Sequence, residues 1–187
     1  MIGRTYSVRR VLEADAHASA RLRVAERPGA TRRAAILLSH SGDSWYWGLA
    51  LVAIWLAGGP YWKGRTVILF LSIAVAAVIV QAIKWLVRRQ RPAGDWGAIY
   101  RRTDPHSFPS GHAARMAMLT VLCAGLGPAW LALLLFVWTP LVALARVAMG
   151  VHYLSDVIAG SLLGILIGVL LLPAAPLALA LMAPLVR

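Results

Sequence analysis

Long runs of apolar residues constrain this chain more than any other feature. Five such runs, each near the length that crosses a bilayer as a helix, occupy residues 44–59, 65–85, 111–126, 129–150 and 155–172. Hydrophobic residues make up 60% of the 187-residue chain and charged residues only 14%, which excludes an ordinary soluble domain. We therefore expect an all-α integral membrane protein, a bundle of five to six transmembrane helices.

The end of the chain is less regular than the five runs. Residues 174–186 are apolar but short, and Pro173, Pro176 and Pro184 interrupt them. A sixth span, a re-entrant piece and a kinked continuation of the fifth helix all fit this pattern, and we favour a short sixth helix.

The first forty residues differ from the rest in their charge. Small apolar residues recur at near-helical spacing among arginines over residues 6–27, which predicts a basic amphipathic helix; a solvated tail is the alternative. We expect residues 1–40 to form an amphipathic surface arm and residues 41–187 the transmembrane core. Because the bases behind the net charge of +12 flank apolar segments, we expect an anionic lipid surface as the partner and no nucleic acid.

Basic and acid–base residues gather in three short blocks at the ends of the apolar runs. The blocks are Lys84 to Arg91-Pro92, Pro109-Ser110-Gly111-His112, and Arg146 to His152 and Asp156. In hydrocarbon such residues are costly unless they pair or face a cavity, so their clustering predicts a functional site. Counting the spans in order places all three blocks on one face of the membrane.

The residue types in the blocks suit phosphoryl transfer. That reaction needs positive donors around the phosphoryl oxygens, an in-line nucleophile and an acid for the leaving oxygen. Lys84, Arg91 and Arg146 are the candidate phosphate clamp. Ser110 is expected to cap a helix whose first N–H groups bind an anion, and Gly111 lets the backbone approach the phosphate closely.

Two histidines are candidates for the proton and phosphoryl chemistry. His152 and Asp156 lie four residues apart, on one face if a helix begins at or just before His152. The carboxylate would then hold Nδ1–H and leave Nε2 unprotonated, so we expect His152 to be the nucleophile of a phosphohistidine mechanism. His112, at a helix start beside the anion site, is the candidate acid for the leaving alkoxide and base for the attacking water.

Taken in order, the three blocks resemble the signature of the type 2 phosphatidic acid phosphatase superfamily, and the chain is similar to its short bacterial members. The resemblance covers residues 84–156. It implies a helical core, the roles assigned above, and hydrolysis of a lipid phosphate without a metal or other cofactor. Ala145 departs from the pattern, because a serine commonly precedes the arginine of the third block. A minor phosphate contact is therefore expected to be missing.

The resemblance implies a membrane lipid as substrate without selecting one. Phosphatidate, phosphatidylglycerophosphate, and polyprenyl phosphates, diphosphates or phosphoribose derivatives are the candidates, and we favour the polyprenyl group. Three alternatives remain open: a vanadate haloperoxidase, a transporter of anions or lipids without hydrolysis, and a metal site made by the two histidines and the aspartate. The surrounding arginines argue against the metal site, since they would repel a cation. The sequence leaves the oligomeric state open.

The distribution of positive charge predicts the orientation. Eight arginines precede the first span and eight bases lie from Lys84 to Arg146, with Arg187 on the same side if the last helix crosses; only Lys63 and Arg65 mark the other side. By the positive-inside rule we expect a multi-pass protein of the bacterial plasma (inner) membrane with its catalytic face toward the cytoplasm.

Several polar residues near the blocks are candidates for lesser roles. The run from His40 to Ser44 is polar enough to contact a headgroup or to orient the catalytic groups, although Asp43 also suits a plain helix cap. Arg101 and Arg102 are candidate headgroup contacts in the connection between the second and third spans. Arg88 and Arg89 are expected to snorkel to the membrane interface.

Overall fold

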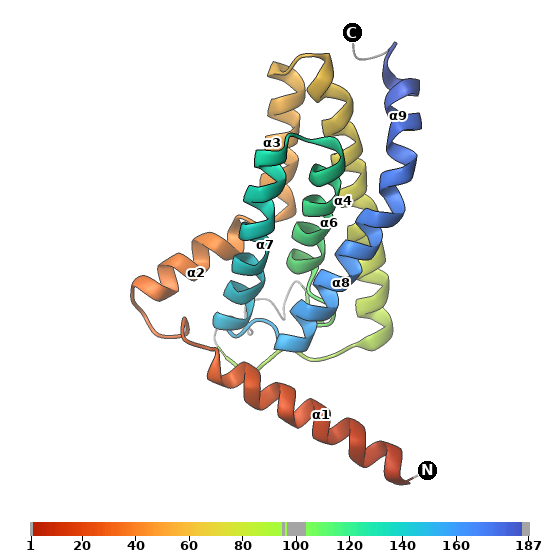
Figure 1. Cartoon of the computed structure of the whole chain (residues 1–187). Helices are drawn as coiled ribbons and strands as arrows, with labels where there is room; N and C mark the ends of the chain where they lie inside the picture. The colour runs from red at the N-terminus through yellow and green to blue at the C-terminus, as the bar shows by residue number, and fades with distance from the viewer. Residues whose placement is uncertain (1, 95, 97–103, 185–187) are drawn as a thin grey trace.

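Helices make up nearly all of the structure, a computed structural model that describes residues 2–94, 96 and 104–184. The elements are α1 Ile2–Arg21, α2 Ala30–His40, α3 Ser44–Ala57, α4 Pro60–Val87, α6 Gly111–Leu126, α7 Ala129–Ala148, α8 Leu154–Leu171, η1 Leu172–Ala174 and α9 Ala175–Met182 (Figure 1). The expected all-α class is confirmed. The boundaries of the five predicted apolar runs match α3, α4, α6, α7 and α8 to within a few residues, and α6 matches without a shift.

Helix α6 lies at the centre of the bundle and packs against α4, α7 and α8. Its side chains Met116, Leu119 and Leu122 are completely buried in the main apolar core. The outer surface is also apolar, with Phe136 of α7 69% exposed and Leu86 of α4 82% exposed. A protein that is apolar both inside and outside is solvated by lipid, so the chain is a membrane protein.

In the part of the chain that the structure describes, three helical segments are long and apolar enough to cross a bilayer: Pro60–Val87, Ala129–Ala148 and Leu154–Met182. Ser44–Ala57 and Gly111–Leu126 are apolar but shorter. The third long segment differs from the separate sixth helix favoured by the sequence. There η1 and α9 continue from α8 away from α1, because the prolines bend the segment without reversing it (Figure 1).

A stripe of glycines brings α8 into backbone contact with α6. A Cβ atom added at Gly160 would lie 2.4 Å from the carbonyl oxygen of Ser110, and one at Gly164 would lie 2.0 Å from that of Ala114. Gly168 continues the stripe one turn later, against Val121. Only glycine permits such a close approach of the two backbones. In a membrane, where the hydrophobic effect does not drive helices together, this close van der Waals packing stabilises the helix pair.

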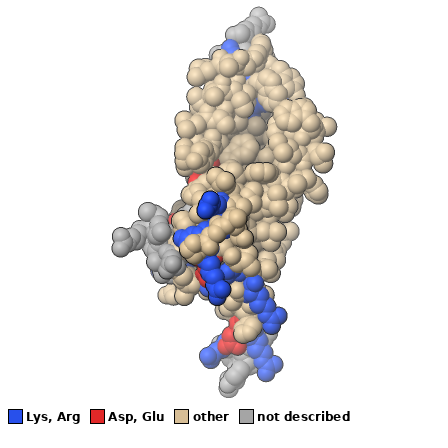
Figure 2. All heavy atoms as spheres, turned by 90° about the vertical axis from the view of Figure 1, so that its left-hand side faces the viewer, with Lys and Arg blue, Asp and Glu red and all other residues tan. Residues whose placement is uncertain are grey.

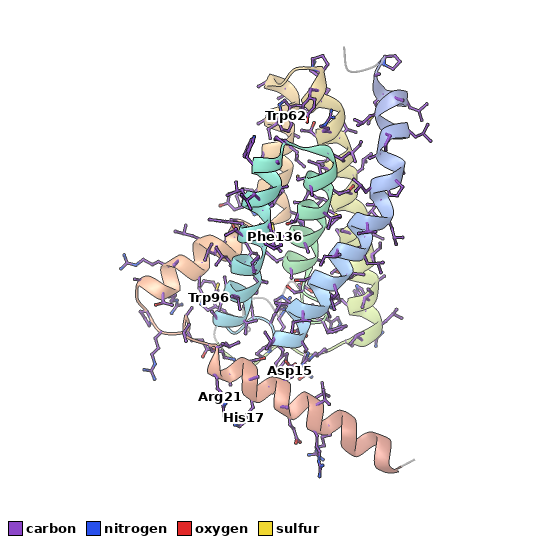
Figure 3. The ribbon with its side chains drawn as sticks, viewed as in Figure 1. Asp15, His17, Arg21, Trp62, Trp96 and Phe136 are labelled. Atoms are coloured by element: carbon purple, nitrogen blue, oxygen red, sulfur yellow. The ribbon has the colours of Figure 1, made fainter. Side chains whose placement is uncertain are left out.

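The N-terminal arm consists of two helices, although the sequence predicted one over residues 6–27. Helix α2 packs on α7, and α1 lies across the start of α8 (Figure 1). Ser19 Oγ accepts a hydrogen bond from Leu154 N at 2.8 Å, and Asp15 Oδ1 accepts one from Ser155 N at 3.0 Å. Because these N–H groups have no partner within α8, the arm caps that helix. Figure 3 shows Asp15 at this junction and Trp62 at the opposite end of the bundle.

Candidate active site

The three sequence blocks meet at one cavity of about 230 Å³ near the end of the bundle that carries α1 and α2. Six of the predicted residues line it, together with Asp104 and Arg115: Lys84, Arg91, Gly111, His112, Arg146 and His152. Helix α4 also adds apolar residues to the lining: Ile73, Ala76, Ala77 and Val80. Lys and Arg side chains gather at this end on the face that Figure 2 shows, and few lie at the other end. The cavity thus joins a cationic site to an apolar surface.

The predicted clamp holds a carboxylate of the chain itself. Asp104 Oδ2 accepts a hydrogen bond from Lys84 Nζ and another, at 2.8 Å, from Arg91 Nη2. Arg91 Nε also donates to the carbonyl oxygen of Asp104 at 2.8 Å. Both cationic side chains are almost fully buried. Two buried cations thus converge on one carboxylate oxygen, an arrangement that also suits a phosphoryl oxygen.

The end of α4 turns sharply so that the bases after Lys84 point in different directions. Arg88 adopts the left-handed conformation with φ of 52° and ends the helix. The Arg89 guanidinium donates to Asp15 at 2.6 Å and to Asp156 at 2.7 Å, and its side chain is only 16% exposed. The expectation that Arg89 snorkels to the interface is therefore wrong, because two buried carboxylates hold it inside.

His152 occupies the loop between α7 and α8 and is almost fully buried. Its Nε2 lies 3.2 Å from Arg91 Nη1, and since a guanidinium only donates, Nε2 is the unprotonated nitrogen. Nδ1 faces Asp156 Oδ2 at 3.5 Å, a contact that is long for a hydrogen bond. Burial, with the charges of Arg91, Arg146 and Lys84, lowers the pKa of His152 well below its usual range. The imidazole is therefore neutral and presents a lone pair toward the clamp.

Asp156 lies at the third position of α8 rather than one helical turn from a helical His152, because α8 begins at Leu154. Its Oδ2 accepts a hydrogen bond from Tyr153 N at 2.9 Å, and Ser110 N donates to its carbonyl oxygen at 2.9 Å. The second and third blocks are thus joined by backbone as well as by side chains.

Ser110 caps α6, as the sequence predicted. Its Oγ accepts a hydrogen bond from Ala113 N at 3.5 Å, and the side chain is completely buried. Gly111 and His112, the first two residues of α6, line the same cavity as the clamp, so the positive end of the helix lies close to it. A helix start and three cations thus converge on the region where Asp104 now lies.

Arg146 is held from the N-terminal arm. Its Nη1 donates to Ser39 Oγ at 2.6 Å, and Ser39 is completely buried at the end of α2. The residue that departs from the family pattern, Ala145, packs in an apolar cluster with Ala35 and Met149. A hydroxyl from residue 39 thus contacts the clamp arginine, which no pattern within the third block indicates.

His112 lies at the second position of α6 and is hydrogen-bonded to Asp43. The two atoms His112 Nε2 and Asp43 Oδ1 are 2.5 Å apart, and Asp43 Oδ2 lies 2.8 Å from His40 Nδ1. Burial opposes the charge on Asp43, but hydrogen bonds from His112 and His40 outweigh it and lower the pKa of Asp43 to about 2. Asp43 therefore contacts a catalytic candidate instead of standing free for a headgroup.

Sequence reasoning missed one cavity residue that spacing could have revealed. Arg115 follows His112 by three residues on a helix, so both side chains share a face. Its guanidinium lines the cavity and donates to the carbonyl oxygen of Gly42. Arg101 and Arg102, the other candidate headgroup contacts, lie outside the described residues. Among the described residues, no group of three or more histidine, cysteine, aspartate or glutamate side chains is placed to bind a metal ion.

Comparisons with known proteins agree with the resemblance of the three blocks. The model of the PAP2 superfamily matches residues 65–178. A decaprenylphosphoryl-5-phosphoribose phosphatase of Mycobacterium tuberculosis is 37% identical over 148 residues, covering 76% of this chain and 79% of the relative. An undecaprenyl-diphosphatase of Sulfolobus acidocaldarius is 35% identical over 100 residues, covering 51% of this chain and 48% of the relative.

A solved structure shares the fold. The PAP2 type phosphatidylglycerolphosphate phosphatase of Bacillus subtilis superposes with a TM-score of 0.69 at 23% sequence identity, covering 86% of this chain and 83% of that one. The helical architecture around the cavity is therefore that of a known membrane phosphatase fold.

Proposed function

This chain belongs to the PAP2 superfamily, and we propose that it hydrolyses the phosphate monoester of a polyprenyl-linked lipid, with a phosphoribose head as the favoured substrate. The observation that carries the proposal is the cavity itself. Cations from Lys84, Arg91 and Arg146 surround one end, two histidines flank it, and the wall from α4 is apolar. A lipid phosphate presents the same combination of a doubly charged head and an apolar tail.

The proposed mechanism has two steps. In the first, the Nε2 lone pair of His152 attacks phosphorus while the clamp neutralises the phosphoryl oxygens, the ester P–O bond breaks, and His112 protonates the leaving oxygen. In the second, His112 takes a proton from water, the water oxygen bonds to phosphorus, and the P–N bond breaks. Asp156 holds the imidazole of His152 from the Nδ1 side, and the backbone at Ser110 and Gly111 binds the anion.

The substrate must displace Asp104 to reach the clamp. The clamp contacts of Asp104 show that a carboxylate fills the position, and a dianionic phosphate competes for it with twice the charge and three acceptor oxygens. The preference for a polyprenyl lipid rests on the relative from Mycobacterium tuberculosis and on the apolar wall, which can contact the first isoprene units.

A phosphate-release assay tests the proposal. Purified protein in detergent with EDTA present is given prenyl phosphoribose 5-phosphate, a prenyl diphosphate, phosphatidate and phosphatidylglycerophosphate. We expect release of inorganic phosphate, fastest from the prenyl phosphoribose, and none from His152→Ala. No release from any lipid by the wild type would reject the function, while EDTA-sensitive release would reject the metal-independent mechanism.

We also propose that the catalytic face opens to the cytoplasm and that the arm, residues 1–40, lies on that face. The arm contributes exposed arginines such as Arg9, Arg10 and Arg21 beside the site, where anionic lipid headgroups attract them. Its contacts with the start of α8 would keep it there. A bacterial plasma membrane is the proposed location.

A further inference from the structure

The histidine assigned as general acid is held by a carboxylate from another part of the chain. Asp43 precedes α3 and lies 69 residues before His112 in the sequence, yet Asp43 Oδ1 is 2.5 Å from His112 Nε2. The second carboxylate oxygen, Oδ2, is 2.8 Å from His40 Nδ1 at the end of α2. The three side chains form one connected set, His40–Asp43–His112, which does not include His152 or Asp156.

The turn that carries Asp43 is fitted to the ring of His112. A Cβ atom at Gly42 would lie 3.1 Å from His112 Cδ2 and 2.9 Å from Val142 Cγ1, so no larger residue fits there without displacing the ring. Arg115 fixes the same turn by donating to the carbonyl oxygen of Gly42. The pairing of Asp43 with His112 is therefore supported by the close packing of Gly42 and by the hydrogen bond from Arg115.

The set has defined proton positions. Asp43 is an anion at neutral pH, since its pKa is about 2, and an ionised carboxylate only accepts hydrogen bonds. His112 therefore carries a proton on Nε2, and His40 carries one on Nδ1. Of the two nitrogens of His112, Nδ1 is the one that remains to exchange a proton with the substrate.

The charges around His112 make Asp43 necessary for that exchange. The positive charges of Arg115 on α6 and Arg146 on α7 repel a proton on the His112 ring. The side chains of Lys84, Arg91 and His152 line the same cavity. Among the described cavity residues the other carboxylate, Asp104, is engaged by the clamp. A protonated His112 surrounded by cations needs an adjacent counterion, and Asp43 is in contact with it.

We propose that Asp43 is a positioning residue for the general acid, and that His40 fixes the orientation of its carboxylate. The inference rests on the proposed phosphatase function and deepens it. In the first step the Nδ1 proton of His112 goes to the leaving oxygen as the P–O bond breaks, and Asp43 retains the Nε2–H. In the second step the neutral Nδ1, still aimed by Asp43, accepts a proton from water as the P–N bond breaks.

The experiment compares two phosphate esters that differ in their need for an acid. Octyl phosphate has a strongly basic leaving alkoxide, whereas 4-nitrophenyl phosphate has a weakly basic leaving group that departs without protonation. The ratio kcat/KM reports only the steps up to the phosphoenzyme, so it isolates proton donation from the later attack of water. The variants are Asp43→Asn, which keeps the shape and removes the charge, and His40→Gln, with Ser44→Ala as a control because its side chain is exposed.

We expect Asp43→Asn to lower kcat/KM for octyl phosphate by about 100-fold, within the range of general acid catalysis, and that for 4-nitrophenyl phosphate by less than about threefold. Its kcat for the aryl ester should fall, with a burst of nitrophenol, because hydrolysis of the phosphoenzyme still needs His112 as a base. His40→Gln should give the same pattern with smaller losses, and Ser44→Ala should match the wild type.

Equal losses on both esters in Asp43→Asn and in His40→Gln would show a structural role only and overturn the inference. Unchanged kinetics on octyl phosphate would overturn it as well. A wild type that hydrolyses neither these esters nor any lipid phosphate would instead reject the proposed function, so the two failures are distinct.

Discussion

The Asp104 carboxylate occupies the phosphate clamp without taking part in the proposed reaction steps, so its effect on phosphate binding can be measured separately. Its carboxylate accepts hydrogen bonds from both Lys84 and Arg91, in the place assigned to the substrate phosphate. Asp104→Asn removes this internal competitor and should lower the inhibition constant of inorganic phosphate about three- to tenfold, the equivalent of a partly exposed ion pair worth about 1 kcal/mol. Product inhibition of phosphate release measures it.

A matched variant distinguishes competition from support. Asp104→Glu keeps the negative charge and should retain weak phosphate inhibition. If Asp104→Asn bound phosphate more weakly than the wild type, Asp104 would be holding the clamp in shape rather than filling it.

The protonation of His152 predicts the pH dependence of the first step. A free histidine is half protonated at a pH of about 6.5. Burial and neighbouring cations lower the pKa of His152, so its side chain stays neutral at pH values below that. The acid limb of kcat/KM should therefore lie below that value. Arg91→Gln removes a positive charge 3.2 Å from Nε2, which raises the pKa of His152 and moves the acid limb to higher pH.

Arg91→Lys is the control for this shift, since it keeps the charge and loses only the planar fork. Both variants will bind phosphate less well, but only Arg91→Gln should displace the limb. Coincident acid limbs in the two variants, measured with the same substrate, would contradict the assignment of His152 as the titrating base.

At the scale of the residue, sequence reasoning worked where partners are close along the chain. Ser110 caps α6, as its position before an apolar run implied. Asp156 lies 3.5 Å from His152, but α8 begins only at Leu154, so the shared helix face expected from their spacing does not form. Sequence reasoning also did not reach Arg89, which pairs with Asp15 74 residues away, or Ser39, which contacts Arg146 across 107 residues. Such contacts depend on how helices pack, which local spacing does not encode.

At the scale of the element, the contact of α8 with α6 positions the site. Gly164→Ala would place a Cβ atom 2.0 Å from the backbone oxygen of Ala114, and backbone cannot move aside as a side chain can. The helices must separate, at a cost of about 1–3 kcal/mol, so we expect a lower thermal midpoint in detergent together with a lower kcat.

Gly48→Ala is the comparison for this variant. A Cβ atom there would meet only Phe70 at 3.8 Å, an ordinary contact, so Gly48→Ala should retain the wild-type midpoint and activity. Equal midpoints for both variants would mean that α8 and α6 tolerate a wider spacing than the structure implies.

Helix boundaries followed from the sequence more closely than the direction of the last helix did. Apolar length alone located α6 and nearly located α7 and α8. It could not say whether prolines after α8 reverse the chain or bend it, because both outcomes satisfy the same apolar composition. Packing decides: Ala175 is almost fully buried, and α9 lies against α4.

At the scale of the whole molecule, this bend sets the topology. With α3, α4, α6, α7 and the combined α8 and α9 as five crossings, the arm and the end of α9 lie on opposite sides of the membrane. We expect a green fluorescent protein fused to the N-terminus to fluoresce in the cytoplasm and an alkaline phosphatase fused after α9 to be active outside. A dark N-terminal fusion together with an inactive C-terminal fusion would place the catalytic face outside, and a signal from only one of the two fusions would mean an even number of crossings.

The glycine stripe on α8 also indicates how such a protein can diversify. Any larger side chain at Gly160 or Gly164 disturbs the backbone that joins the anion site to the nucleophile, so these positions resist exchange. Ala77 and Val80 on α4 line the same cavity, where they contribute apolar side chains. New lipid preferences should therefore arise by replacing apolar residues of α4 at the cavity while the reacting groups, including Lys84 on the same helix, stay fixed.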